Sequence, residues 1–151
     1  MQERGAVPPL TANADSAPAS RWPFIAGAAA AVVVADQLTK WWALETLGDG
    51  RVIDLVGSLR FNLALNPGGA FSVGREYTEV FVVAGFVLLA GLLLWGRWAV
   101  TRPAAIAVGL IVGGALGNLT DRVVRDLDGR VVDFIDVQWW PVFNVADIAV
   151  T

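Results

Sequence analysis

The stretch GGALGNLTDR, residues 113–122, brings an apolar, glycine-rich run to an abrupt polar end. The run begins near Pro103, and Asn118, Asp121 and Arg122 follow it. A membrane-spanning helix needs roughly 17–25 such residues. A charged residue at the centre of a spanning helix costs about 2.5–3.5 kcal/mol, and less at the membrane boundary. We therefore predict a spanning helix that ends at these three polar side chains.

Other apolar segments precede and follow this one. Residues 22–44 and 80–98 are each long enough to span a bilayer, and a further apolar stretch begins near residue 142. The chain ends at Thr151, so we expect a fourth helix that is truncated after about half a span.

Composition agrees with a membrane protein. Hydrophobic residues make up 56% of the 151-residue chain and charged residues 17%, against about 25% charge in a typical soluble domain. Mean hydropathy is +0.58. Tryptophan prefers the membrane–water boundary, and the seven tryptophans lie near the ends of the apolar segments, at Trp22, Trp41, Trp42, Trp95, Trp98, Trp139 and Trp140.

The remaining segments have other characters. Residues 1–20 are rich in Pro, Ala, Ser and Asn, and we predict a disordered tail that does not resemble a signal peptide. Residues 52–65 contain short β-like runs around Gly57 and Ser58, which indicate a small hairpin. In residues 129–140 apolar and polar side chains partly alternate, so this segment could add a strand or an interfacial segment.

Several function classes are excluded by residues that the chain lacks. It has no cysteine and no histidine, so disulfides, thiolate or imidazole metal sites, histidine-dependent triads and HExxH metalloproteases are ruled out. A net charge of −3 makes nucleic acid an unexpected partner. Acid–base chemistry is left to Asp, Glu, Tyr, Arg and the single Lys40.

Connectivity gathers the unusual polar residues on one membrane face. Three consecutive spans place the ends of the first and third helices, and the start of the fourth, on the same side. Arginines before the first helix and between the second and third favour a cytoplasmic N-terminus by the positive-inside rule, although the opposite loops also carry arginines mixed with acids. The polar cluster is then expected to face outward.

The central hypothesis concerns Asp121 and Asp147. Two carboxylates brought close share a proton, because like charges a few ångströms apart cannot both ionise cheaply. One can then take a proton from water while the other polarises a carbonyl. Asn118 and Asn144 each lie three residues upstream and could orient these aspartates or bind substrate backbone. The alternatives are structural: an Asp121–Arg122 pair, an Asp147 favoured by a helix dipole, and two simple caps.

Two further motifs carry polar groups. Asp36 and Lys40 are spaced i, i+4, so they can pair on one helix face and lower each other's cost in a membrane, with a purely structural role as the alternative. Asn66 opens the stretch NPGGAF, residues 66–71, where Gly68 and Gly69 permit a turn or a close backbone approach.

Four motifs, taken in order, resemble those of the lipoprotein signal peptidases, the signal peptidase II family of aspartic membrane peptidases. They are DQLTK at 36–40, NPGGAF at 66–71, GNLTDR at 117–122 and FNVAD at 143–147. The resemblance covers about residues 22–151. It is specific because four motifs occur in order and at suitable places relative to the spans.

The resemblance implies an all-α membrane protein: a four-transmembrane-helix bundle, here with the fourth helix truncated, carrying a small extracytoplasmic β-platform. Residues 21–151 would form the membrane-embedded peptidase domain, multi-pass in the bacterial cytoplasmic (inner) membrane, with both termini cytoplasmic in the family plan and the active site at the extracytoplasmic face. The family cleaves diacylglyceryl-modified prolipoproteins just before the lipidated cysteine. Neither a cofactor nor a metal is expected.

By the same resemblance Asp121 and Asp147 are the catalytic aspartates. Other motif positions would support this pair, or contact the substrate and the inhibitor globomycin within the membrane lipids. They are Asp36, Lys40, Asn66, Gly68, Asn118, Arg122 and Asn144.

Three other functions are compatible with parts of the pattern. Ser72 and Lys40 could form a serine–lysine dyad, which needs no histidine. Intramembrane carboxylates could instead serve a small transporter or proton-relay protein, but the polar residues cluster near one face rather than crossing the bilayer. A structural membrane anchor would leave the paired motifs unexplained.

Overall fold

The computed structural model describes residues 20–68, 78–96 and 101–151. Its elements in chain order are α1 (Trp22–Leu47), β1 (Val52–Val56), β2 (Leu59–Asn66), α2 (Thr78–Gly96), α3 (Arg102–Val123), β3 (Val131–Asp136) and α4 (Val145–Val150). Several predicted features lie outside the described residues: residues 1–19 of the tail predicted at 1–20, residues 69–71 of the NPGGAF motif, Ser72 and Trp98.

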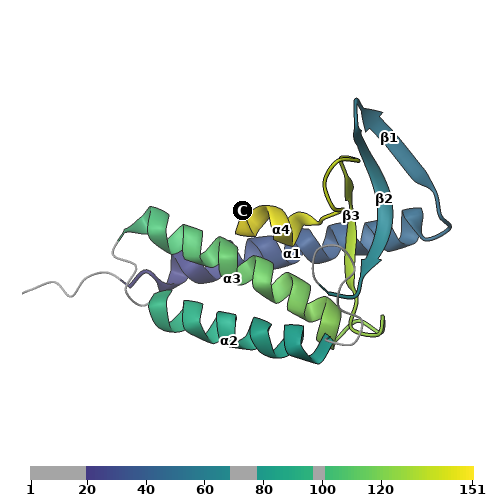
Figure 1. The fold of residues 1–151 in the computed structure, drawn as a ribbon. Coiled ribbons are helices and arrows are strands. Elements are labelled where there is room, and N and C mark those ends of the chain that lie inside the picture. The colour runs from purple at the N-terminus through teal and green to yellow at the C-terminus, as the bar shows by residue number, and fades with distance from the viewer. Residues whose placement is uncertain (1–19, 69–77, 97–100) are drawn as a thin grey trace, which may run out of the picture.

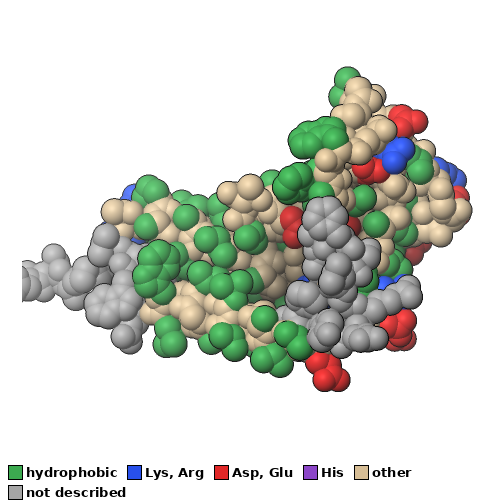
Figure 2. Space-filling view, in the orientation of Figure 1, with side chains coloured by type: hydrophobic (Ala, Val, Ile, Leu, Met, Phe, Trp, Pro, Cys, Tyr) green, Lys and Arg blue, Asp and Glu red, His purple; other side chains and the backbone are tan. Residues whose placement is uncertain are grey.

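The helices lie alongside one another and the sheet stands at one end of them (Figure 1). Both α1 and α3 are long and apolar enough to cross a membrane, and α2 contains a shorter apolar stretch at Val82–Leu92. Figure 2 shows hydrophobic side chains over much of the helical part, while most acidic and basic side chains gather towards the sheet. The fold is that of a helical protein suited to a membrane, with a polar end.

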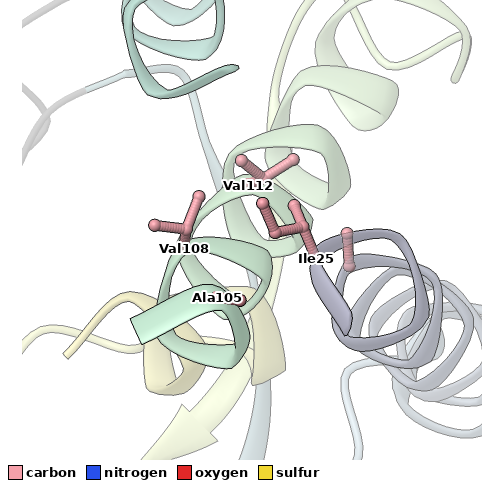
Figure 3. Close-up of a cluster of buried hydrophobic side chains, with 5 residues drawn as sticks. Ile25, Ala105, Val108 and Val112 are labelled. Atoms are coloured by element: carbon pink, nitrogen blue, oxygen red, sulfur yellow. The ribbon is translucent and has the colours of Figure 1, made fainter. Parts of the chain in front are cut away.

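Close packing of α1 on α3 depends on small residues of the opening stretch. A Cβ at Gly113 would stand 2.7 Å from the Cβ of Val32 and 2.8 Å from the carbonyl oxygen of Ala29. Helices that approach this closely need small residues at the contact. The apolar core beside this contact contains Ile25, Ala29, Ala105, Val108 and Val112 (Figure 3).

The sheet is antiparallel, with strand order β1-β2-β3. The hairpin predicted at 52–65 is confirmed, and its turn contains Gly57 at φ +57°. The predicted additional strand near 129–140 is β3, whose residues are mostly buried. One face of the sheet packs on the end of α1, where the Trp42 ring lies 5.1 Å from Phe61 and 6.1 Å from Phe134 between centroids. Trp42 thus joins helix to sheet, whereas its neighbour Trp41 is exposed.

A candidate aspartic active site at the polar end of the helices

A buried lysine stands at the centre of the polar end. Lys40 Nζ lies 2.9 Å from Asp36 Oδ2 and 2.9 Å from Asp121 Oδ2, and all three side chains are fully buried. The i, i+4 pair of Asp36 and Lys40 predicted from the sequence is therefore formed. It is also extended, because the same ammonium group binds the aspartate at the end of α3. A buried ammonium between two carboxylates leaves none of the three charges unpaired.

The Asp121 carboxylate is held from every side. Oδ2 also accepts a hydrogen bond of 3.0 Å from the backbone N–H of Val132, and Oδ1 accepts from Gln37 Nε2 and Arg125 Nε, both at 3.1 Å. Arg125 in turn donates from Nη2 to Gln37 Oε1 at 2.8 Å. Asp121 therefore has cations on both oxygens and ties the start of β3 to the end of α3.

Asp133, in the middle of β3, has a different environment. The residue is 3% exposed, and its carboxyl accepts two amide hydrogen bonds, from Asn66 Nδ2 at 3.1 Å and from Asn144 Nδ2 at 2.7 Å. Burial, and next the negative charge of Asp147, raise the pKa of Asp133 to about 7, while the two amides and Lys40 act in the opposite direction. Asp133 can therefore carry a proton near neutral pH.

Asp147 is positioned by the start of its own helix. Its Oδ2 accepts from the backbone N–H of Asn144 at 3.1 Å, and Asn144 Oδ1 accepts from the backbone N–H of Asp147 at 3.0 Å. This reciprocal capping box fixes both side chains at the helix N-terminus. The cap predicted as an alternative role for Asn144 is thus present, and the same side chain also reaches Asp133.

Asn118 links the two groups of carboxylates. Its Oδ1 accepts from Lys40 Nζ at 2.9 Å and from Asn144 Nδ2 at 3.0 Å, so its Nδ2 must face the other way. That nitrogen donates to Asp147 Oδ1 at 2.9 Å. Asp121 is therefore connected to Asp147 through Lys40 and Asn118, and among the described residues no hydrogen bond or ion pair joins the two aspartates directly.

The other predicted positions lie around this site. Arg122 is partly buried beside Asp121, Asp133 and Asp147, and it donates from Nη1 to the carbonyl of Asn118 at 3.3 Å. Gly68, at φ +132°, donates its N–H to Asn66 Oδ1 at 2.9 Å. This short turn leaves Asn66 Nδ2 directed at Asp133.

Sequence reasoning missed Asp133 as a site residue. The signal was available, because a carboxylate in the apolar run VVDF of a buried strand needs compensation or a function. Gln37 and Arg125, which complete the contacts of Asp121, were also missed. The structure brings all nine predicted site residues to the polar end and adds these three.

An apolar cavity of about 390 Å³ opens beside Asp147. It lies between α2, α3 and α4, is lined mainly by small and aliphatic residues such as Leu88, Ile111 and Val150, and reaches Asn118 and Asp147. The site therefore has an apolar approach on one side.

Buried aspartates at the end of membrane-type helices, in a chain without histidine or cysteine, fit the class of aspartic peptidases that work in membranes. Comparison with known proteins gives the family. The family model described as signal peptidase (SPase) II matches residues 28–151, and the chain belongs to this family. The serine–lysine and proton-relay hypotheses are not favoured by this result.

Relatives and solved structures agree. The lipoprotein signal peptidase of Mycobacterium tuberculosis is 36% identical over 97% of this chain and 79% of the relative. That of Mycobacterium avium is 39% identical over 88% and 75%. A bacterial membrane enzyme solved by the in meso method at 2.3 Å resolution superposes with a TM-score of 0.73 and 29% identity, covering 85% of this chain and 80% of that one.

Proposed function

We propose that this chain removes the signal peptide from diacylglyceryl-modified prolipoproteins, cleaving the peptide bond before the lipidated cysteine. Membership of the signal peptidase II family supports the substrate class. The apolar cavity beside Asp147 supports it too, because it offers space for the apolar part of such a substrate.

We further propose that Asp133 and Asp147 form the catalytic pair, in place of the pair Asp121 and Asp147 expected from the motifs. The observation that carries this is that the charges of the two carboxylates are balanced by different partners. Among the described residues Asp133 accepts hydrogen bonds from amides only, and burial, followed by the charge of Asp147, raises its pKa to about 7. Asp121 is bound by Lys40 and Arg125. Perturbed carboxylates of the first kind suit acid–base catalysis.

In this mechanism the pair holds one proton and acts as a unit. The Asp147 carboxylate takes a proton from water, while the Asp133 carboxylic acid donates a hydrogen bond to the scissile carbonyl oxygen. The water oxygen forms a bond to the carbonyl carbon, and a tetrahedral intermediate results. As that intermediate collapses, the C–N bond breaks and the leaving amine takes the proton from Asp147.

The other site residues act as positioning groups in the proposal. Asn118 and Asn144 hold the orientations of Asp147 and Asp133. Asn66 donates to Asp133 from the turn that Gly68 makes possible. Lys40, Asp36 and Asp121 fix the helices and the start of β3, and Arg122 balances the negative charge of the site.

Residues 21–151 form the membrane-embedded peptidase unit in this proposal, in a multi-pass arrangement of the bacterial inner membrane. The four-helix bundle includes α2 and α4 together with the two helices that meet the length and hydropathy of a span. The sheet then lies on the extracytoplasmic side, where membrane lipids and globomycin would also meet the site.

Cleavage of a diacylglyceryl-modified prolipoprotein by the purified chain in lipid vesicles tests both parts. General acid–base groups contribute about 10²–10⁴-fold, so Asp133→Asn and Asp147→Asn should each lose at least that much rate. Asp136→Asn is the matched control, because Asp136 is a buried carboxylate of the same strand that pairs with Arg60 at 2.8 Å. It should cleave at close to the parental rate.

The outcomes separate the two assignments. If Asp133→Asn kept full activity while Asp121→Asn was folded but inactive, the catalytic pair would be Asp121 and Asp147. An unmodified precursor that is cleaved as fast as the lipidated one would refute the substrate class while leaving the pair in place.

A further inference from the structure

A closed loop projects from the sheet between β3 and α4. Its base is a bridge in which Ile135 N donates to the Phe143 carbonyl at 2.9 Å and Phe143 N donates to the Ile135 carbonyl at 3.0 Å. The loop lies on the side of the sheet towards the helices, next to the start of α4 (Figure 1). It is therefore held at both ends and presents a fixed tip.

Two tryptophans occupy that loop and have little cover. Trp139 is 76% exposed and Trp140 62% exposed, with their rings packed edge to face at 6.5 Å between centroids. Each large indole ring exposes apolar area to water, which is unfavourable. Such a pair is therefore suited to a partner rather than to bulk water.

A residue in a strained conformation directly precedes the pair. Gln138 has φ +71°, a left-handed conformation that a residue with a Cβ adopts at a cost. Its backbone N–H donates to Asp136 Oδ1 at 2.7 Å, and its Nε2 donates to the carbonyl of Ser58 at 3.0 Å. Strained backbone persists where its surroundings fix it. The second hydrogen bond also joins the loop to the β1–β2 turn.

The turn adds apolar side chains of its own. Leu55 is 48% exposed and Val56 75% exposed, immediately before Gly57 and Ser58. We name Trp139, Trp140, Leu55 and Val56 the tryptophan surface. It is free of formal charge, and Gln138 clips its two parts together.

We propose that the tryptophan surface inserts into the headgroup region of the bilayer and anchors the sheet to the membrane. The loop stands beside the helices at their polar end, and α1 and α3 are long and apolar enough to span (Figures 1 and 2). Indole rings with one polar edge favour that boundary.

This anchoring has a consequence for the site. The loop follows directly from β3, the strand that carries Asp133. Lipid contact at one end of β3 and the Asp121–Val132 hydrogen bond at the other would set the depth of Asp133 relative to the bilayer surface. A membrane-bound substrate would then meet the carboxyl at a constant height.

Fluorescence of the full chain in phosphatidylcholine vesicles tests the proposal without reference to cleavage. The parent is compared with the double variant Trp139→Phe, Trp140→Phe, which keeps the loop apolar. The emission lost in the variant belongs to the two tryptophans. We expect this difference emission to be quenched by lipids brominated near the headgroup, and less by lipids brominated near the chain ends.

The proposal would be overturned if brominated lipid did not quench the difference emission, or if that emission had the maximum of water-exposed indole. A change of oligomeric state in the double variant would overturn it too, because it would identify a second copy of the chain as the partner. A second variant, Gln138→Ala, removes the clip to Ser58 while leaving both tryptophans. Its shallow quenching should fall below that of the parent. Unchanged quenching in Gln138→Ala would refute the role of the clip.

Discussion

One polar network contains two groups of carboxylates, one on α1 and α3 and the other on β3 and α4. The two groups differ in the partners that bind them. Asp36 and Asp121 share the ammonium of Lys40 at 2.9 Å each. Asp133 has amide donors instead, and burial together with Asp147 raises its pKa to about 7. Asp121 and Asp133 are both almost fully buried, so burial alone does not explain the difference.

The difference teaches where chemistry is possible. A carboxylate with a cation on each oxygen is committed to holding the structure, because any change of its charge leaves buried partners unpaired. A buried carboxylate with neutral donors can exist in either protonation state near neutral pH. The same residue type, within one site, can therefore be framework or acid.

Removal of the shared cation should give the largest effect. Lys40→Met leaves two buried carboxylates without their partner, and breaking a buried pair costs about 3–5 kcal/mol. We expect a loss of that size in the free energy of unfolding. Arg51→Met is the control, because Arg51 pairs with Asp49 at 3.2 Å with both side chains about 60% exposed, and should change stability by less than about 1 kcal/mol. Equal, small losses would deny the framework role.

A smaller effect is expected from crowding the framework. A Cβ at Gly117 would stand 2.5 Å from Asp36 Oδ2 and 3.3 Å from the Cβ of Ala146. Gly117→Ala should therefore destabilise by about 1–3 kcal/mol, as overpacking does. Gly27→Ala meets nothing within 4 Å and should be neutral or stabilising, since Ala favours a helix over Gly. Thermal unfolding of both variants in one detergent decides this.

The proposed pair of Asp133 and Asp147 should impose an alkaline limit on cleavage. The proposed active form needs a proton on Asp133, so the rate should fall as pH rises through about 7. The Asn66 hydrogen bond lowers the pKa of Asp133. Its loss in Asn66→Ala should therefore move the limit upward, by about one pH unit for one hydrogen bond to a charged group.

Asn62→Ala is the matched control for that pH profile. Asn62 lies on the same strand and donates to Asp136 at 3.1 Å, outside the proposed pair. Its profile should match that of the parent. Two results would show that the alkaline limit does not come from Asp133. One is an equal shift of the pH profile in both variants, and the other is an unchanged limit in Asn66→Ala.

The smallest expected change is in the stability of Asp133→Asn. A raised pKa means that the folded protein holds the proton better than the unfolded chain, whose Asp titrates near 3.9. Stability from this group is present at low pH and is lost as pH rises through about 7. At pH 8 the neutral amide should therefore leave the melting temperature unchanged or raise it slightly. A marked drop would make Asp133 part of the framework.

Much of this arrangement could be predicted from sequence because its signals are local. Apolar segment lengths predicted the helices, and the turn around Gly57 and Ser58 predicted the hairpin. The spacing of Asp36 and Lys40 predicted their pair. Connectivity alone predicted that the motif residues gather at one end.

What sequence could not supply is how charges are shared between elements. The i+3 spacings of Asn118 and Asn144 make Asp121 and Asp147 look equivalent. Yet Lys40, 81 residues before Asp121, forms an ion pair with Asp121. In the part of the chain that the structure describes, it is linked to Asp147 through Asn118. Asp133 has no such motif spacing, and its role depends on amides that come from β2 and from the start of α4.

The Asp36–Lys40 ion pair also bears on the order in which the chain is made. Asp121 is synthesised long after α1, so Lys40 must wait for its second partner. Until then Asp36, one turn away at 2.9 Å, supplies the counter-charge within the same helix. The two charges in the apolar part of the first helix therefore neutralise each other before α3 is made, which lowers the cost of placing that helix in lipid. The same ion pair thus serves the first helix during synthesis and the packing of α1 against α3 in the folded protein.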